Sequence, residues 1–177
     1  RQQPGKLTFA SAGTGTIIHM AGELFKYYAG IDIVHVPFKG GTPATLSLLT
    51  GEVDMQVNDL STLLTHVKSG KLRALAAAHT QRLPPLPETP TFAELGMPDV
   101  VSSTWWALAV PAQTPPAIRT QILAAQNNVL ARPDYIACLA DLAMQPLVLT
   151  SAQANEVIKR EIAKWRKVAT AANVQAE

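Results

Sequence analysis

The chain has 177 residues, of which 47% are hydrophobic and only 16% charged, and its formal net charge is +2. This length and apolar content suffice for a hydrophobic core and argue against a disordered chain. Basic residues cluster only on the last predicted helix, beside two glutamates, so we expect no nucleic-acid partner, and the lone Cys138 excludes an intrachain disulfide.

The first eighty residues alternate short β-prone runs with helical patterns. Strands are expected at residues 7–10, 32–36, 53–57 and 72–77. Gly30 is expected to close the first helix, and Thr42 with Pro43 to open the second as N-cap and first helical residue. The alternation predicts an α/β fold with a mainly parallel sheet that helices cover on both faces.

The organisation changes near residue 100. A proline-rich stretch at residues 83–90 leads into Thr91 and Glu94, which have the capping-box spacing of a short helix. An extended apolar run at residues 101–110 follows, and then three helical stripes with a brief strand at residues 147–149 before the last. We expect the apolar stripes of this second part to lack partners within the chain.

The junction between the first strand and the first helix is the leading candidate site. Ligands of parallel α/β sheets bind beyond the carboxyl ends of the strands, and the free N–H groups and dipole of a helix N-terminus favour anions. Its predicted ligand-binding residues are Ser11, Ala12, Gly13, Thr14, Gly15, Thr16 and, one helical turn on, His19. The sequence therefore predicts an anion cradle, with a simple tight turn as the alternative.

Two further strand ends point to the same rim of the predicted sheet. Phe38, Lys39 and Gly40 follow the second strand, and Asn58 and Asp59 follow the third. We expect all five residues to contribute to ligand binding. The alternative is that Asn58 or Asp59 only caps the next helix and that Lys39 is a solvated loop residue.

The sequence lacks the motifs that would identify nucleotide binding, metal binding or hydrolysis. Ile18 stands where a dinucleotide fingerprint needs its third glycine, and no Gly-Lys-Ser/Thr motif occurs. The histidines show no metal-ligand spacing, so neither a metal nor another cofactor is expected. An α/β hydrolase-like enzyme using Ser11, His19 and Asp59 is a weaker alternative, because Ser11 is not in a G-x-S-x-G elbow. A homo-oligomeric interaction module without ligand binding is another.

The chain resembles the Bug receptors, the periplasmic substrate-binding proteins of tripartite tricarboxylate transporters. The resemblance rests first on PGKLTFASAGTGT, AGELFKYYAGIDIVHVPFKGG, GEVDMQVNDL and SGKLRALAAA, in this order and spacing. It continues through RLPPLPETPTFAELGMPD, TWWALAVPAQTP and EIAKWRKVATAANV, and so covers essentially the whole chain.

The resemblance implies a fold like that of type II periplasmic binding proteins, with two α/β lobes around a cleft. Residues 1–102 would form the second lobe, which carries the carboxylate-binding loops. Residues 103–177 would be the return segment of the first lobe, most of which precedes this sequence in the family. The sequence begins without Met and without a signal-peptide profile, so we expect a truncated chain.

The resemblance also implies a function, that of a non-enzymatic periplasmic receptor. Its ligand would be a di- or tricarboxylate, an aromatic acid or an acidic amino acid, and its closed form would be presented to membrane subunits of the transporter. One lobe alone is expected to bind weakly or not at all. Because Trp105, Trp106 and Trp165 would lack their covering lobe, we expect a homodimer, formed by exchange of the C-terminal segment.

Overall fold

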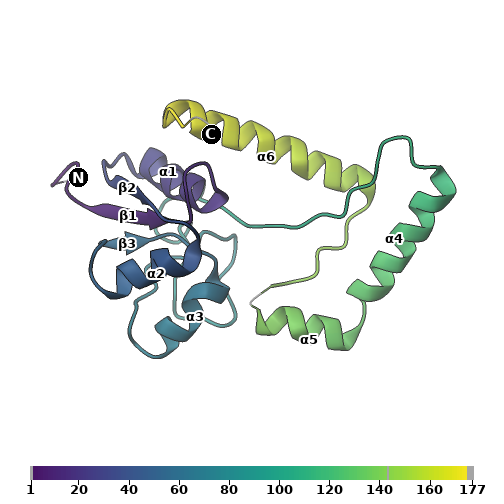
Figure 1. Cartoon of the computed structure of the whole chain (residues 1–177), viewed down its shortest axis with the longest axis horizontal. Coiled ribbons are helices and arrows are strands. Elements are labelled where there is room, and N and C mark those ends of the chain that lie inside the picture. The colour runs from purple at the N-terminus through teal and green to yellow at the C-terminus, as the bar shows by residue number, and fades with distance from the viewer. Residues whose placement is uncertain (1, 143, 175–177) are drawn as a thin grey trace. The chain divides into compact units, whose positions relative to one another are not determined.

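The computed structural model describes residues 2–142 and 144–174 and divides into two compact units. The first unit is Arg1–Thr104 together with Arg160–Glu177, and the second is Trp105–Lys159. The first unit contains β1 (Thr8–Ser11), α1 (Ile17–Ala29), β2 (Val34–Pro37), α2 (Gly41–Leu49), β3 (Met55–Gln56) and α3 (Leu60–Lys68) (Figure 1). Later in the chain come α4 (Pro116–Leu130), α5 (Pro133–Asp141) and α6 (Ser151–Ala171).

The three strands form a parallel sheet in the order β2-β1-β3. Phe9 of the central strand β1 lies opposite His35 of β2 and Met55 of β3. Because paired residues of a parallel sheet point to the same face, this register places Phe9 and His35 on one side of the sheet. The predicted α/β class with a parallel sheet is confirmed.

Helices cover both faces of the central strand, as predicted. The Phe9 side chain packs against α1, where a Cβ added at Gly22 would lie only 2.2 Å from Phe9 Cε2. The next residue, Ala10, points to the opposite face and packs with Ala44 of α2 and with Val53. Phe9, Ala10 and Ala44 are completely buried, so β1 is the core of the first unit.

A second cluster joins the apolar stripe of α1 to residues near the end of the chain. Met20 and Leu24 of α1 pack against Val100 and against Val168 of α6. Phe25, Phe92 and Trp165 lie around this cluster. The stripe predicted from the helical spacing of α1 is therefore buried, and part of its cover comes from α6.

The predicted ends of the helices are partly confirmed. Gly30 closes α1 with φ of +59°, in the left-handed conformation that favours glycine. The prediction for Thr42 is wrong, because α2 already begins at Gly41 and has Gly40 as its N-cap. Thr91 and Glu94 form the predicted capping-box hydrogen bonds, but around a turn instead of a helix.

Two predicted strands are absent from the described residues. In the segment 72–77, only Ala77 forms a bridge, to Thr91. The Ala77 N–H donates to Pro90 O, and Pro90 has no N–H with which to extend the ladder. Residues 147–149 are also not a strand, since no described segment pairs with them. A β-prone run needs a neighbour to become a strand.

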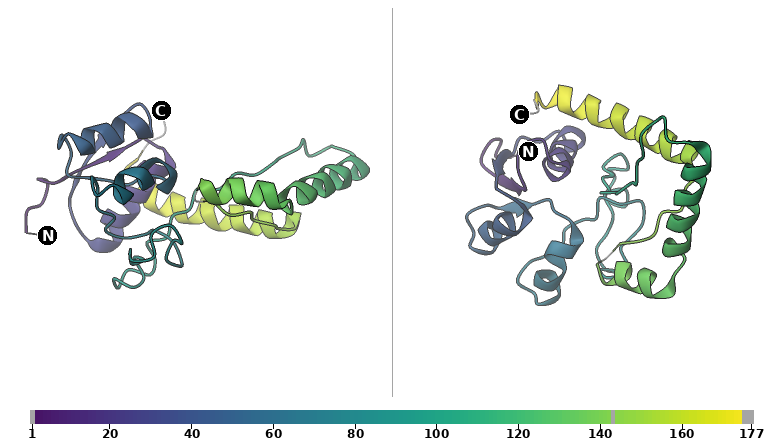
Figure 2. Two further views of the ribbon diagram at one scale, coloured as in Figure 1. Left: turned by 90° about the horizontal axis from the view of Figure 1, so that it is seen from below. Right: turned by 45° about the vertical axis from the view of Figure 1, so that its right-hand side comes forward.

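The second unit is mainly helical. Its α4 and α5 are in contact and form a bent pair (Figure 2), and each starts with a proline, which needs no N–H partner in the first turn. Many of its apolar side chains are exposed, most of all Trp106 at 71%. Among the helices in residues 2–142 and 144–174, none is both long and apolar enough to span a bilayer.

Candidate functional site

The loop between β1 and α1 is a compact turn built on two glycines. Gly13 and Gly15 have φ of +133° and +75°, which side chains other than hydrogen disfavour. Thr16 is the N-cap of α1: its Oγ1 accepts from the His19 N–H at 3.2 Å and donates to Gly13 O at 2.7 Å. The small residues predicted here are thus required by the backbone of the turn.

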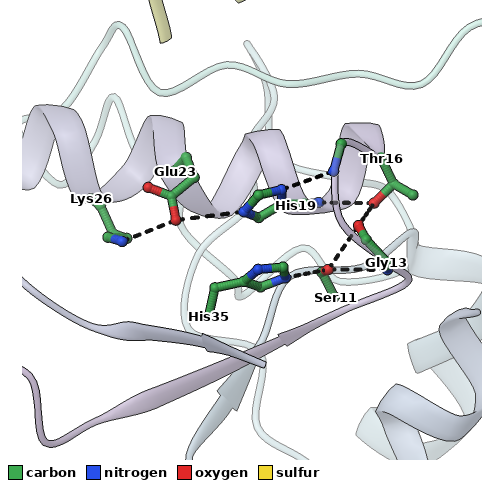
Figure 3. Close-up of polar contacts among 8 residues, drawn as sticks. Ser11, Gly13, Thr16, His19, Glu23, Lys26 and His35 are labelled. Carbon is green, nitrogen blue, oxygen red and sulfur yellow. Dashed lines mark hydrogen bonds and ion pairs between the residues drawn. The ribbon is translucent and has the colours of Figure 1, made fainter. Parts of the chain in front are cut away.

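Ser11 supports this turn from below and does not face solvent. Its side chain is fully buried, and its Oγ lies 2.6 Å from Nε2 of His35 and accepts from the Gly13 N–H at 3.2 Å (Figure 3). The His35 ring in turn stacks on the His19 ring, with centroids 3.7 Å apart and planes 15° from parallel. The hydroxyl predicted as a ligand donor is therefore committed to holding the loop.

His19 holds the other glycine of the turn. Its Nδ1 accepts from the Gly15 N–H at 3.1 Å, which places the ring proton on Nε2. That nitrogen lies 3.7 Å from Oε1 of Glu23, and the same oxygen accepts from Lys26 Nζ at 3.0 Å (Figure 3). The row His19, Glu23 and Lys26 therefore runs along one side of α1 beneath the loop.

The pKa values of Glu23 and His35 are shifted by burial and by neighbouring groups. Burial alone would raise the pKa of Glu23, but the nearby His19, the hydrogen bond from Lys26 and the Lys26 charge outweigh it and lower that pKa. Burial, reinforced by the neighbouring His19, lowers the pKa of His35 to about 4. His35 is consequently neutral at pH 7, while Glu23 and Lys26 form an ion pair.

Two backbone N–H groups of the turn are unpaired within the described residues. Within the described residues, the N–H groups of Ala12 and Thr14 have no hydrogen-bond acceptor, and Thr14 is exposed. Both lie beside the N-terminus of α1, whose dipole favours negative charge. Unpaired N–H donors at a helix N-terminus can hold an anion.

The loop after β2 lies against this turn. The Phe38 N–H donates to Ser11 O at 3.0 Å, and the Gly40 N–H donates to Ala12 O at 3.2 Å. Phe38 is half-buried, whereas Lys39 is exposed. The Gly40 N–H is thus used to join the two loops, and Lys39 brings a positive charge to their rim.

The loop after β3 joins the same rim through its amide side chain. Asn58 Oδ1 accepts from the Asp59 N–H at 2.9 Å, and its Nδ2 donates to Gly41 O at 3.4 Å. Asp59 is the N-cap residue of α3 without a side-chain capping bond, and its Oδ1 instead accepts from Thr104 Oγ1 at 2.8 Å. The structure therefore brings all three predicted loops together, with Asn58 tying the third to α2.

The hydrolase-like arrangement of Ser11, His19 and Asp59 is not formed. Ser11 is paired with His35, His19 with Gly15 and Glu23, and Asp59 with Thr104. No group of three His, Cys, Asp or Glu within residues 2–142 and 144–174 is arranged to hold a metal ion.

The contacts that His35 and Glu23 make beneath the turn were not predicted from the sequence. The signal for Glu23 is the spacing of His19, Glu23 and Lys26, at i, i+4 and i+7, which places polar residues along one side of an otherwise apolar helix. The signal for His35 is weaker, because its approach to Ser11 depends on the register between β1 and β2.

The sequence profile described as "Tripartite tricarboxylate transporter family receptor" matches residues 1–174. Protein BugT of Bordetella pertussis is 34% identical over 95% of this chain and 52% of its own length. A UPF0065 protein from the tcbD-tcbE intergenic region of Pseudomonas sp. (strain P51) is 36% identical over 95% of the chain and 50% of its own length. The chain thus spans about half the length of these two curated relatives.

Another relative has nearly the length of this chain. It is a UPF0065 protein from the clcB-clcD intergenic region of Pseudomonas knackmussii, 36% identical over 87% of the chain and 92% of its own length.

Solved structures confirm the predicted binding-protein fold. A protein of R. palustris solved with adipate superposes with a TM-score of 0.84 at 30% identity, over 98% of this chain and 58% of that one. MatC from Rhodopseudomonas palustris with bound malate gives a TM-score of 0.79 at 28% identity, over 93% of this chain and 57% of that one.

Proposed function

Since the chain belongs to the tripartite tricarboxylate transporter receptor family, whose members are solute-binding receptors and not enzymes, we propose that it forms one wall of a periplasmic binding site for a small carboxylate. The observation that carries the proposal is the β1–α1 turn. Its Ala12 and Thr14 N–H groups are unpaired within the described residues, and its backbone is held by Ser11, Thr16 and His19. A rigid pair of donors at a helix N-terminus suits one carboxylate group.

The ligand class follows from the chemistry of the rim and from the neighbours. Structures similar to this chain were solved with adipate and with malate, both dicarboxylates. The exposed Lys39 adds a positive charge beside the turn. We place di- and tricarboxylates first, ahead of aromatic acids and acidic amino acids, and we propose that the complete receptor delivers them to the membrane subunits of a tripartite transporter.

The division of the chain into a lobe of residues 1–102 and a return segment of residues 103–177 is part of the same proposal. A receptor cleft needs a second wall to remove water from the ligand, so the chain alone should bind weakly. We propose that joining it to the preceding half of BugT restores tight binding.

The proposal is tested by calorimetry and thermal shift with malate, adipate, citrate, benzoate and aspartate, on the chain alone and on the BugT fusion. Stabilisation of the fusion by at least one carboxylate, and not by the neutral diamide of malate, is the expected result. If neither form responds to any of the acids, the turn is structural and the receptor proposal fails.

Lys39→Glu in the fusion is expected to weaken dicarboxylate binding by roughly five-fold, because it replaces an attractive charge at the rim by a repulsive one. The loss should shrink as salt is raised. Lys68→Glu, at the far end of α3, makes the same change of net charge and should leave the affinity unaltered. Equal effects of the two variants would show that only the overall charge matters.

We also propose that the isolated chain forms a homodimer through the exposed apolar side chains of the segment Trp105–Lys159, by exchange of the C-terminal segment. Light scattering after size-exclusion chromatography should give twice the monomer mass of 18.9 kDa. Trp106→Ser should shift the chain toward monomer, whereas Tyr27→Ser, an equally polar change in the first unit, should not. A monomer at micromolar concentration would contradict the dimer.

A further inference from the structure

The β1–α1 turn is held from beneath at both of its glycines. The Gly13 N–H donates to Ser11 Oγ, which lies 2.6 Å from His35 Nε2, and the Gly15 N–H donates to His19 Nδ1. Thr14 stands between these two points, and its N–H has no acceptor within the described residues. Fixing the glycines on either side fixes the direction in which this N–H points.

The two imidazoles form one support. Their rings are stacked at 3.7 Å, so a displacement of either ring moves the other (Figure 3). His19 is held along α1 by Glu23, and His35 is held in β2, where its ring also contacts that of Phe9 with centroids 4.9 Å apart. The support therefore joins the second strand to the first turn of α1 across the buried side of the loop.

We propose that His35 is a positioning residue for carboxylate recognition, acting through Ser11 on the Gly13 backbone and through the stacked His19 on Gly15. His35 does not touch the ligand. It holds in place the backbone that carries the Ala12 and Thr14 donors, whichever of the two bonded atoms, Ser11 Oγ or His35 Nε2, carries the shared hydrogen. This role rests on the proposed function, in which these donors bind the carboxylate.

If His35 served only for packing, its ring would need the right shape but no hydrogen-bonding nitrogen. Packing against Phe9 and His19 needs a flat ring of this size, which phenylalanine also provides. The 2.6 Å contact to a fully buried hydroxyl needs a hydrogen-bonding nitrogen at the Nε2 position. The two roles are thus separated by His35→Phe, which keeps the ring, and His35→Gln, which keeps a polar atom near that position.

The experiment measures amide hydrogen exchange at Gly13 and Gly15 by NMR in the 177-residue chain, and malate and adipate affinity in the chain and the BugT fusion. We expect His35→Phe to speed exchange at Gly13 about ten-fold and to weaken binding by a similar factor, with His35→Gln within about three-fold of wild type. His66→Phe, on α3 and outside this network, is the matched control and should change neither.

Ser11→Ala removes the same hydrogen bond from the other side and serves if His35→Phe fails to fold. It should reproduce the faster exchange and weaker binding, and the double variant should be no worse than the more affected single variant. Wild-type exchange and affinity in His35→Phe, or in Ser11→Ala, would overturn the positioning role. If neither the wild-type chain nor its BugT fusion binds any of the five acids, the proposed function fails by itself, and exchange at Gly13 still decides whether His35 positions the turn.

Discussion

Gly22→Ala is expected to lower the free energy of unfolding by about 1–3 kcal/mol, although the same change in an exposed helix raises helix stability by about 1 kcal/mol. A Cβ at this position would lie 2.2 Å from Cε2 and 2.8 Å from Cδ2 of Phe9. Phe9 is fully buried between β1 and α1 and has the His35 ring against it, so it has no space into which to move. The helix must therefore shift away from the sheet.

Urea denaturation of the chain measures this effect. Ser61→Ala on the exposed side of α3 is the control, and it should change stability by no more than about 0.5 kcal/mol. Phe9→Leu should relieve the clash, so that the double variant is more stable than the sum of the two single changes predicts. A Gly22→Ala chain as stable as wild type would show that α1 and β1 are not packed as closely as described.

Acidification is expected to destabilise the fold between pH 6.5 and pH 4 through His35. The pKa of His35 is lowered to about 4 in the folded chain, whereas an unfolded histidine titrates near 6.5. Between these values the unfolded chain binds a proton that the folded chain does not, so the stabilisation is complete above about pH 6.5 and is lost as the pH falls toward 4. Because the ring is only half-buried, we expect a loss of about 1–2 kcal/mol instead of the full shift.

The pH dependence is measured by urea denaturation at steps between pH 7 and pH 5. This window avoids Glu23, whose lowered pKa makes it lose stabilisation only at more acidic pH. His35→Gln should be less stable at pH 7 but should show a flatter profile, because the titrating ring is gone. Equal slopes for wild type and His35→Gln would assign the acid sensitivity to another group.

Local chemistry made the β1–α1 turn predictable. Gly13 and Gly15 indicate backbone conformations that other residues avoid, and Thr16 indicates the start of a helix. The position of the loop in the chain could therefore be predicted without knowledge of the rest of the fold. The role of Ser11 could not be placed in this way. Whether its hydroxyl points outward to a ligand or inward to His35 depends on which residue of β2 lies beside it, and that register is a property of the assembled sheet.

Strands were less predictable than helices for a related reason. The helical stripes of α1, α4, α5 and α6 carry their own backbone hydrogen bonds and were all found. The runs at 72–77 and 147–149 have the composition of strands, but their backbone groups need a neighbour that the described chain does not place beside them. The fold as a whole was predicted mainly through the resemblance of the complete pattern to a known family, and the solved structures confirm it.

The order in which the ribosome makes the chain gives the Val168 contact a further meaning. Met20 and Leu24 are synthesised long before Val168 of α6, which is one of the side chains that cover them. Domains generally fold as units during synthesis, and this one cannot complete the core around α1 until α6 has been made. A chain that stops before Arg160 would carry the strands, the glycine turn and the histidine pair, but the part of the cover over Met20 and Leu24 that Val168 and Trp165 provide would be missing.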